Sequence, residues 1–486
     1  MANRIVSGLG WTTASTVLRN LVGLLQIAIL TRFLAKGDFG IVAVANLFVT
    51  FTGMFLDMGM SAGIIHRQYI TNKEYSSLFW LNIFFGIALT SILYLLAPVF
   101  ASGYDSADLI SVIRLICFTI FLNAVGTQQR TFCQKKAYFK RLAVIESVAH
   151  ISTFLVAFGT AFLGFGVYSL AYSTLAGAIV LNLSHFCIGL VKDSRLSFHF
   201  SIKETLPFLK IGVYQVGSQI LDFFTRELDI IIVSATLGLE FLGVYNIAKR
   251  IPTALYSFIQ PIVGRVFTPL FAEMANNTTR IKQNYMKLSK SLSWISFPMY
   301  MLLAALSPTV ISIVFGADYI DGVPVMMVFC LKYAFNGVNG VCGALQVATG
   351  RTDIGLVWTI YLISSTAVVY YLTSLFGVSV FLLGVCFLTL LNAIVCWYMQ
   401  FRKMVGVLLS EYLTIYTQSF MISTVLAVIV YFLHTTPSII YAIVSSCLFI
   451  TLYVILLLNG RDGQAFKEIV CRLPLPINRI KRILKK

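Results

Sequence analysis

Fourteen hydrophobic segments occupy nearly the whole chain, and Lys and Arg gather in every second connection between them. A bilayer core is crossed by a helix of about 20 apolar residues. Cytoplasmic connections of membrane proteins carry the excess of Lys and Arg. The pattern therefore predicts an all-α, polytopic membrane protein with about 14 transmembrane helices. With the N-terminus in the cytoplasm, an even number of spans places the C-terminus there as well.

The spans are expected to begin near Gly8, Phe39, Leu78, Leu109, Leu142, Gly166, Pro207, Leu239, Met286, Val323, Gly355, Gly377, Tyr412 and Ile439. The predicted outer connections are short and nearly free of Lys and Arg: Ser102–Asp108, Leu163–Gly166, Leu237–Phe241, Gly316–Pro324, Phe376–Ser379 and His434–Ser438. The first outer connection, with Arg32 and Lys36, is the exception. So little chain is left outside the spans that it has no room for a soluble catalytic domain.

The composition excludes several classes of function. Hydrophobic residues make up 58% of the chain and charged residues 11%, which is too apolar for a soluble protein of 486 residues. The net charge of +17 comes mostly from the inner connections, so it favours anionic membrane lipids as partners and argues against nucleic acid.

The nine cysteines form no CxxC pair and are interpreted as free thiols, with no metal site and no cofactor. HExxH, GxSxG and P-loop motifs are missing from the sequence, so we expect no enzyme activity.

The first twelve spans resemble two copies of six. Leu34-Ala-Lys-Gly-Asp-Phe39-Gly40, followed by Ala45, aligns with Leu237-Gly-Leu-Glu-Phe-Leu242-Gly243, followed by Ala248, at a shift of 203 residues. Each copy holds an even number of spans, so the repeat is parallel and predicts a substrate path between two six-helix lobes. A chance match between apolar sequences is the alternative. The expected division is 1–200 for the N-lobe, 201–405 for the C-lobe, 406–460 for two further helices and 461–486 for a basic cytoplasmic tail.

Polar residues within two spans are the candidate functional residues. In the seventh span Gln215, Gln219, Asp222, Arg226 and Asp229 are spaced so that they share one helix face. The first span carries a similar stripe that includes Arg19 and Gln26. Ionisable groups at bilayer depth are costly and belong beside a partner or a wet cavity, so we expect both stripes on the facing surfaces of the two halves.

A phosphate-bearing headgroup is the ligand that this set of side chains suits. Arg19, Arg226, Lys249 and Arg250 are the candidates for holding it, because Arg donates two hydrogen bonds to phosphate at once. Alternatively, Arg226 only neutralises Asp222 and Asp229 within one helix. Lys249 and Arg250 are adjacent and diverge around the helix, so at most one of them faces a cavity. Asp222, Asp229 and Glu146 are candidates for coupling transport to a gradient of H+ or Na+, although Glu146 and His150 also suit a packed i, i+4 pair.

Several ordered stretches resemble the polysaccharide flippases of the multidrug/oligosaccharidyl-lipid/polysaccharide (MOP) exporter superfamily, in particular the Wzx-type and colanic-acid-exporter branch. They include Phe39-Gly40, Asp57-Met-Gly59, Leu78-Phe-Trp80-Leu-Asn82, Gln128-Gln129-Arg130, Leu242-Gly243-Val-Tyr245 and Phe315-Gly316. The resemblance implies a bacterial inner-membrane carrier with a V-shaped pair of lobes and spans one, two, seven and eight around the cavity. It also implies an undecaprenyl-pyrophosphate-linked oligosaccharide as substrate, carried from the inner to the outer leaflet. Cavity arginines on spans one and eight hold the pyrophosphate in related lipid flippases, and Arg19 and Arg250 occupy those spans.

The hypothesis is therefore an alternating-access flippase for a repeat unit of O-antigen, capsule or exopolysaccharide, working beside polymerase or other assembly proteins. A multidrug or organic-cation antiporter of the same superfamily is the main alternative. It would favour an acidic cavity, whereas spans one and eight are basic here. A polytopic glycan polymerase or glycosyltransferase, and a scaffold that transports nothing, are further alternatives.

Overall fold

The protein is helical throughout the part that the computed structural model describes, residues 2–104, 106–193, 196–274, 277–433, 438–460 and 463. No β-strand occurs in these ranges, which confirms the all-α class. Within these described ranges, eleven helical segments are long and apolar enough to cross a membrane, or twelve if the bent pair α12 and α13 forms one span. The chain is thus a multi-pass membrane protein. The predicted basic tail lies almost wholly outside the described residues.

By its internal contacts the chain divides into two units, Met1–Ile247 and Ala248–Lys486. The helices that begin in the first unit are α1 (Ala2–Leu30), α2 (Lys36–Asp57), α3 (Met60–His66), α4 (Asn72–Ala101), α5 (Ala107–Ile116), α6 (Phe118–Lys135), α7 (Phe139–Phe162), α8 (Tyr168–Asp193), α9 (Ile202–Thr236) and α10 (Gly238–Ile262). This grouping by contacts does not test the predicted lobe boundaries, which rest on the repeat and stay a prediction.

The second unit contains the last part of α10 and all later elements. They are η1 (Val263–Phe267), α11 (Thr268–Glu273), α12 (Thr278–Ala305), α13 (Ser307–Val314), η2 (Ala317–Gly322), α14 (Val323–Asn339), α15 (Val341–Thr349), α16 (Thr352–Ser374), α17 (Val378–Cys396), η3 (Trp397–Phe401), α18 (Arg402–Val405), α19 (Leu409–Leu433) and α20 (Ile439–Asn459).

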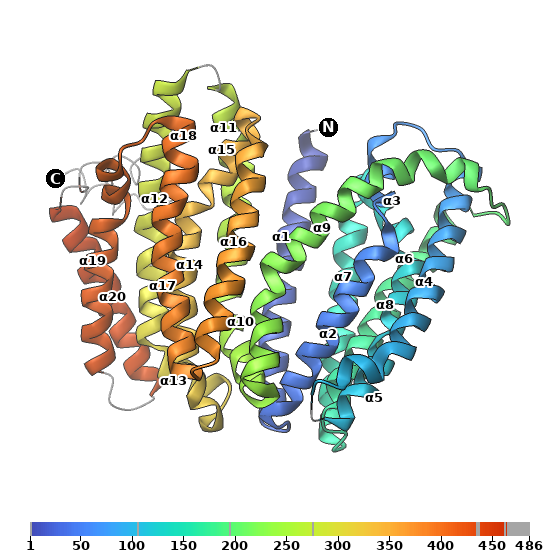
Figure 1. Ribbon diagram of the computed structural model, residues 1–486, viewed down its shortest axis with the longest axis horizontal. Helices are drawn as coiled ribbons and strands as arrows, with labels where there is room; N and C mark the ends of the chain where they lie inside the picture. Colours follow the sequence, from blue (N-terminus) through green and yellow to red (C-terminus); the bar gives the residue numbers. More distant parts are fainter. Residues whose placement is uncertain are drawn as a thin grey trace. The chain divides into compact units, whose positions relative to one another are not determined.

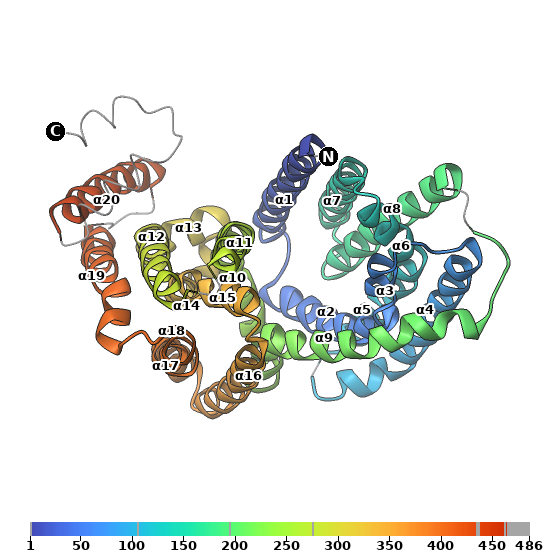
Figure 2. The same cartoon turned by 90° about the horizontal axis from the view of Figure 1, so that it is seen from above.

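In the first unit α7 packs against both α1 and α8, and α6 packs against α4 and α8 (Figures 1 and 2). The long helix α9 lies against α2, α3 and α4. Its apolar side faces inward: Phe223, Ile230 and Val233 are buried, and the Phe223 ring lies 5.3 Å from the ring of Phe51 on α2. Other residues of α9, among them Gln215, Asp222 and Arg226, remain exposed.

The segment that leads into α9 is fastened to the start of α4. Ser76 Oγ accepts a hydrogen bond from the backbone N–H of Ser197 at 3.0 Å, and the Trp80 indole N–H donates to the Ser197 carbonyl at 3.1 Å. Ser77 Oγ donates to Glu204 Oε2 at 2.6 Å, and the Trp80 and Phe198 rings stack with their centroids 5.5 Å apart. These contacts fix where α9 begins relative to α4.

The two copies of the sequence repeat contact each other where α2 and α10 begin. A Cβ added to Gly40 would overlap the carbonyl oxygen of Leu239, and a Cβ added to Gly243 would overlap the carbonyl oxygen of Lys36. At the shift of 203 residues Gly40 corresponds to Gly243 and Lys36 to Leu239, so each contact is the counterpart of the other. Only glycine permits this approach of the two backbones. The interpretation of the two motifs as copies of one repeat stays a prediction.

In the second unit α12 packs against α14 and α19, and a buried network of tyrosine hydroxyls joins α14 to α19. Asn339 Oδ1 accepts hydrogen bonds from the hydroxyl groups of Tyr416 at 2.6 Å and Tyr412 at 3.1 Å. Because buried polar groups need partners, this network ties α19 to one position on the unit.

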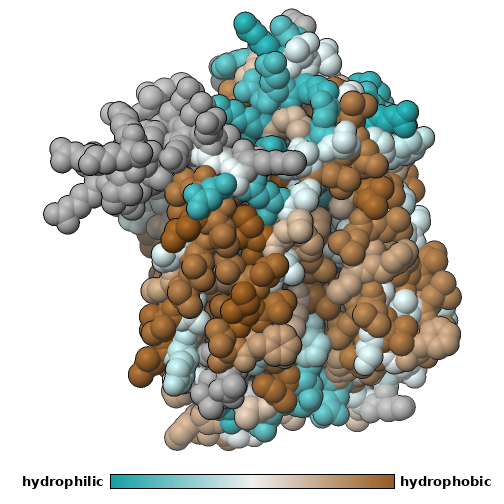
Figure 3. All heavy atoms as spheres, turned by 90° about the vertical axis from the view of Figure 1, so that its left-hand side faces the viewer, coloured by the Kyte–Doolittle hydropathy of each residue, from teal (hydrophilic) through white to brown (hydrophobic). Residues whose placement is uncertain are grey.

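The outer face of α19 and α20 is suited to lipid. Figure 3 shows hydrophobic side chains gathered over the middle of this face, with hydrophilic ones gathered at the top. Met421, Val425, Ile440, Ile443 and Leu448 are among the exposed hydrophobic residues on the two helices. Such an exposed apolar surface is expected in a bilayer, where lipid tails cover it.

Candidate functional site

The polar stripe of α9 divides into an exposed part and a buried end. Gln215, Asp222 and Arg226 are exposed and Gln219 is half-buried, so four of the five predicted residues keep part of their surface accessible. Asp229 is different, because only 5% of its surface is exposed. Its carboxylate accepts hydrogen bonds from the Tyr245 hydroxyl of α10 at 2.8 Å and from the backbone N–H of Ile230 at 2.9 Å. Asp229 therefore holds α9 against α10.

Arg226 is not neutralised within its own helix. Among the described residues, no ion pair joins its guanidinium to Asp222 or to Asp229, so the alternative of an internal network does not form in this structure. An exposed guanidinium without a carboxylate partner keeps all five N–H donors available for a ligand.

The α1 stripe lies beside a group of charges on α6 and α7. Arg19 is exposed and Gln26 is half-buried. Arg19, Arg130 and Glu146 all lie within electrostatic range of His150. Glu146 Oε1 pairs with Arg130 Nη2 at 2.8 Å, so the carboxylate that we considered for a pair with His150 has an arginine partner instead. Arg19 itself has no ion pair with any described residue.

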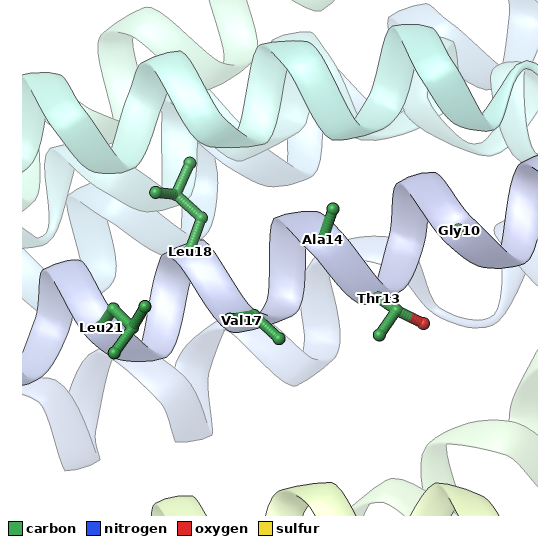
Figure 4. A pocket seen from close by; sticks show the side chains of 6 residues that line it. All are labelled: Gly10, Thr13, Ala14, Val17, Leu18 and Leu21. Atoms are coloured by element: carbon green, nitrogen blue, oxygen red, sulfur yellow. The ribbon is translucent and has the colours of Figure 1, made fainter. Parts of the chain in front are cut away.

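A hollow of about 670 Å³ runs along another side of α1 (Figure 4). Its lining residues are Gly10, Thr13, Ala14, Val17, Leu18 and Leu21. Successive helix residues turn by about 100°, so Arg19 lies on the opposite side of α1 from Val17 and does not line the hollow. This surface suits a hydrocarbon chain rather than a phosphate or a sugar.

The candidates in the second unit are in two different environments. Lys249 is half-buried, and its ammonium lies 5.7 Å from the centre of the Phe329 ring, whereas Arg250 is exposed. A cation over an aromatic face is attracted by the ring quadrupole. Arg250 is the more accessible of these two neighbours for an anionic ligand.

Three polar side chains that the sequence did not bring together meet inside the first unit. Asp57 at the end of α2, Asn82 on α4 and Gln128 on α6 line one small cavity. All three occur in the stretches that resemble the polysaccharide flippases, but nothing in the sequence placed them together; Asp57 accepts a hydrogen bond from the Ser61 N–H at 3.1 Å. No sequence signal shows that residues 25 or more positions apart converge. In the described part of the chain no three His, Cys, Asp or Glu side chains cluster as metal ligands.

Residues 29–324, more than half of the chain, match the family described as "Polysaccharide biosynthesis protein". The chain belongs to this family. The match confirms the resemblance to polysaccharide flippases that the motifs indicated. It runs from the end of α1 to the start of α14 and so includes the α9 stripe.

Two bacterial polysaccharide biosynthesis proteins are similar to this chain over most of their length. The teichuronic acid biosynthesis protein TuaB of Bacillus subtilis is 27% identical over 364 residues, which is 74% of each chain. The lipopolysaccharide biosynthesis protein WzxC of Escherichia coli is 24% identical over 420 residues, covering 85% of this chain and 84% of WzxC.

The fold is that of a solved membrane flippase. The lipid II flippase MurJ, in an inward closed conformation, superposes with a TM-score of 0.72 at 14% sequence identity. The match covers 93% of this chain and 98% of MurJ. At this identity the likeness establishes the fold.

Proposed function

We propose that this protein flips an undecaprenyl-pyrophosphate-linked oligosaccharide, a repeat unit of O-antigen, capsule or exopolysaccharide, from the inner to the outer leaflet of a bacterial inner membrane. The observation that carries the proposal is a lipid-flippase fold in a member of a polysaccharide biosynthesis family. MurJ is described as a lipid II flippase and WzxC as a lipopolysaccharide biosynthesis protein, and the two descriptions together support this step. No covalent chemistry is required, since the barrier is removal of the sugars and phosphates from water.

The exposed cations supply partners for the headgroup. Arg226 and Arg19 have no ion pairs among the described residues, and each can donate two parallel hydrogen bonds to a phosphate. Gln26, Gln215 and Gln219 offer amide groups to sugar hydroxyls, and Lys249 and Arg250 offer further positive charge. The apolar hollow on α1 gives the polyprenyl tail a surface outside the charged region.

The transport cycle that we propose is alternating access by two parallel six-helix lobes with both termini in the cytoplasm. It requires fourteen spans, so α9 and α10 must cross the membrane as well, although neither is among the apolar segments counted above. Their lengths of 35 and 25 residues are sufficient. The alternation of basic connections supports the orientation.

Energy for the cycle comes, in this proposal, from a gradient of H+ or Na+, with no cofactor. Asp222 is exposed on α9 and accessible to an ion, whereas Asp229 and Glu146 each already have a hydrogen-bonding or ionic partner. Anionic membrane lipids and the polymerase and other assembly proteins of the glycan are the partners that we expect.

Deletion of the gene in its own organism tests the function. We expect the complete lipid-linked repeat unit to accumulate on the inner leaflet and the surface glycan to disappear, with both restored by the wild-type gene on a plasmid. Lipid extracts and a leaflet-specific sugar label give the measurement. Unchanged lipid intermediates and surface glycan, together with a new sensitivity to cationic drugs, would favour the antiporter instead.

A further inference from the structure

A small polar cavity inside the first unit is not explained by headgroup binding. Its polar lining consists of Asp57 at the end of α2, Ser61 on α3, Asn82 on α4 and Gln128 on α6, and its volume is about 10 Å³. A cavity of this size accepts one water molecule or one small ion. We call these four residues the oxygen cluster, because each can present an oxygen atom to the cavity.

The two amide side chains are oriented by hydrogen bonds on their nitrogen side. Asn82 Nδ2 donates to the Ala124 carbonyl at 3.1 Å, and Gln128 Nε2 donates to the Tyr75 carbonyl at 2.8 Å. A carbonyl accepts and never donates, so neither amide can be turned around without losing this bond. The amide oxygens are therefore the atoms left for the cavity.

Both amide oxygens are buried acceptors without a donor in the described structure. Asn82 is 2% exposed and Gln128 is 3% exposed, and neither Oδ1 of Asn82 nor Oε1 of Gln128 receives a hydrogen bond from a described residue. An unsatisfied buried acceptor costs about 1–3 kcal/mol, and here two of them border one cavity. This pattern indicates a ligand that attracts oxygen lone pairs.

The Asp57 carboxylate completes the cluster with a charge. Its described partners are the backbone N–H and hydroxyl group of Ser61, with the hydroxyl 2.7 Å from Oδ1. No described Lys or Arg pairs with it. Lys135 on the neighbouring helix α6 donates instead to the carbonyl oxygens of Ile64 and Arg67. The negative charge of Asp57 is thus not compensated by a side-chain cation within the unit.

We propose that the oxygen cluster binds one dehydrated Na+ ion, held by the Asp57 carboxylate, the Ser61 hydroxyl and the amide oxygens of Asn82 and Gln128. Hard cations choose oxygen ligands, and one carboxylate matches one positive charge. A single water would satisfy the two amide oxygens with its two hydrogens but would leave the carboxylate uncompensated. Na+ satisfies all the oxygens and the charge together.

An ion bound by the oxygen cluster would affect the position of α9. The turn between α2 and α3 lies in close backbone contact with α9. A Cβ added to Gly59 in the turn would overlap the backbone of Gly212 on α9, and a Cβ added to Gly212 would overlap the backbone of the turn. Gly59 also has a φ of +72°, which favours glycine. An ion that ties Asp57 to α4 and α6 therefore fixes the turn on which α9 packs, and, if the flippase proposal holds, links the ion to the helix that carries Arg226.

Thermal unfolding of the purified full-length protein in detergent tests the site. The melting temperature should rise saturably with NaCl, but not with KCl or choline chloride at equal ionic strength. Asp57→Asn keeps an oxygen that can accept from the Ser61 N–H, yet removes the charge, so the Na+ concentration at half-effect should increase about tenfold or more.

Asp38→Asn is the matched control, since Asp38 accepts a backbone N–H bond from Ala35 at the other end of the same helix, 3.0 Å away. Its Na+ response should equal that of the wild type. Ser61→Ala, which leaves the carboxylate in place, should weaken the response by a smaller factor and covers the case in which Asp57→Asn fails to fold. The proposal also predicts direct binding of radioactive sodium by the wild type.

Equal melting temperatures in Na+, K+ and choline would overturn the proposal in favour of a buried water, and a stabilisation that follows pH alone would overturn it in favour of a proton. An undiminished Na+ response in both Asp57→Asn and Ser61→Ala would place the ion elsewhere. These measurements report Na+ binding alone. A protein that binds Na+ at the oxygen cluster but flips no lipid would contradict the proposed function and would still support the Na+ site.

Discussion

Arg226 and Asp229 lie three residues apart on α9, yet they have different roles in the structure. Helical spacing placed both on one polar face, and the face itself is observed for Gln215, Asp222 and Arg226. Asp229 is covered because Tyr245 on α10 reaches it. Spacing within one helix predicts which residues share a side, but it cannot show which part of that side a neighbouring helix covers. For the same reason, the sequence could not show that Asp57, Asn82 and Gln128 line one cavity.

Arg226→Ala should reduce flipping without unfolding the protein. Loss of a charge-assisted contact to phosphate corresponds to about a 10- to 100-fold weaker interaction. Among the described residues Arg226 has no ion-pair partner whose loss would destabilise the fold. Arg226→Lys should retain part of the activity, because it keeps the charge but not the paired donors. Recovery of surface glycan in the deletion strain, at matched membrane protein level, is the measurement.

Arg114→Ala is the control for this prediction. Arg114 also lies in a predicted span, but its guanidinium rests 4.9 Å from the centre of the Tyr94 ring and has a local role. Full surface glycan with Arg226→Ala, at normal protein level, would remove Arg226 from the headgroup site.

Among the helices, the sequence predicted the apolar segments long enough to span a membrane better than it predicted the breaks within those segments. Apolar length and alternating charge are local properties, so they are readable from the chain. The segment that begins near Leu109 is a single apolar run, but the structure builds it from α5 and α6, which meet at Cys117. Near Leu306 the chain bends by 63° between α12 and α13. Pro308 in the first turn of α13 permits that break, although proline also occurs inside α4 and α12 without ending them.

The reciprocal glycine contact between α2 and α10 should be intolerant of added volume. Gly40→Ala places a methyl group on the Leu239 carbonyl, so the backbones must separate, at a cost of about 1–3 kcal/mol. Gly37→Ala is the matched control one turn earlier, where an added Cβ meets no atom within 4 Å. We expect a lower melting temperature in detergent for Gly40→Ala and an unchanged or slightly higher one for Gly37→Ala. Equal melting temperatures for the two variants would show that the contact is loose.

At the scale of the whole molecule, hydropathy and motif order were enough to predict a multi-pass carrier of the polysaccharide flippase type. The family match and the MurJ-like fold agree with that prediction. The sequence could not identify the glycan, because sugar recognition depends on side chains from several helices whose positions are set by packing. The ion site that we propose was equally out of reach, since neutral oxygens such as those of Asn82 and Gln128 have no ligand-specific spacing in sequence.

Under the proposed function, this protein alone moves a lipid-linked oligosaccharide across a bilayer. The most direct measurement reconstitutes the purified protein into liposomes that contain the polyprenyl-pyrophosphate-linked repeat unit of its own organism, and follows the sugar on each leaflet with an enzyme that cannot cross the membrane. We predict protein-dependent movement between leaflets that Arg226→Ala slows and that a lipid without the pyrophosphate does not show. Folded wild-type protein that leaves the lipid on its original leaflet, with either ion gradient imposed, would contradict the proposed flippase function.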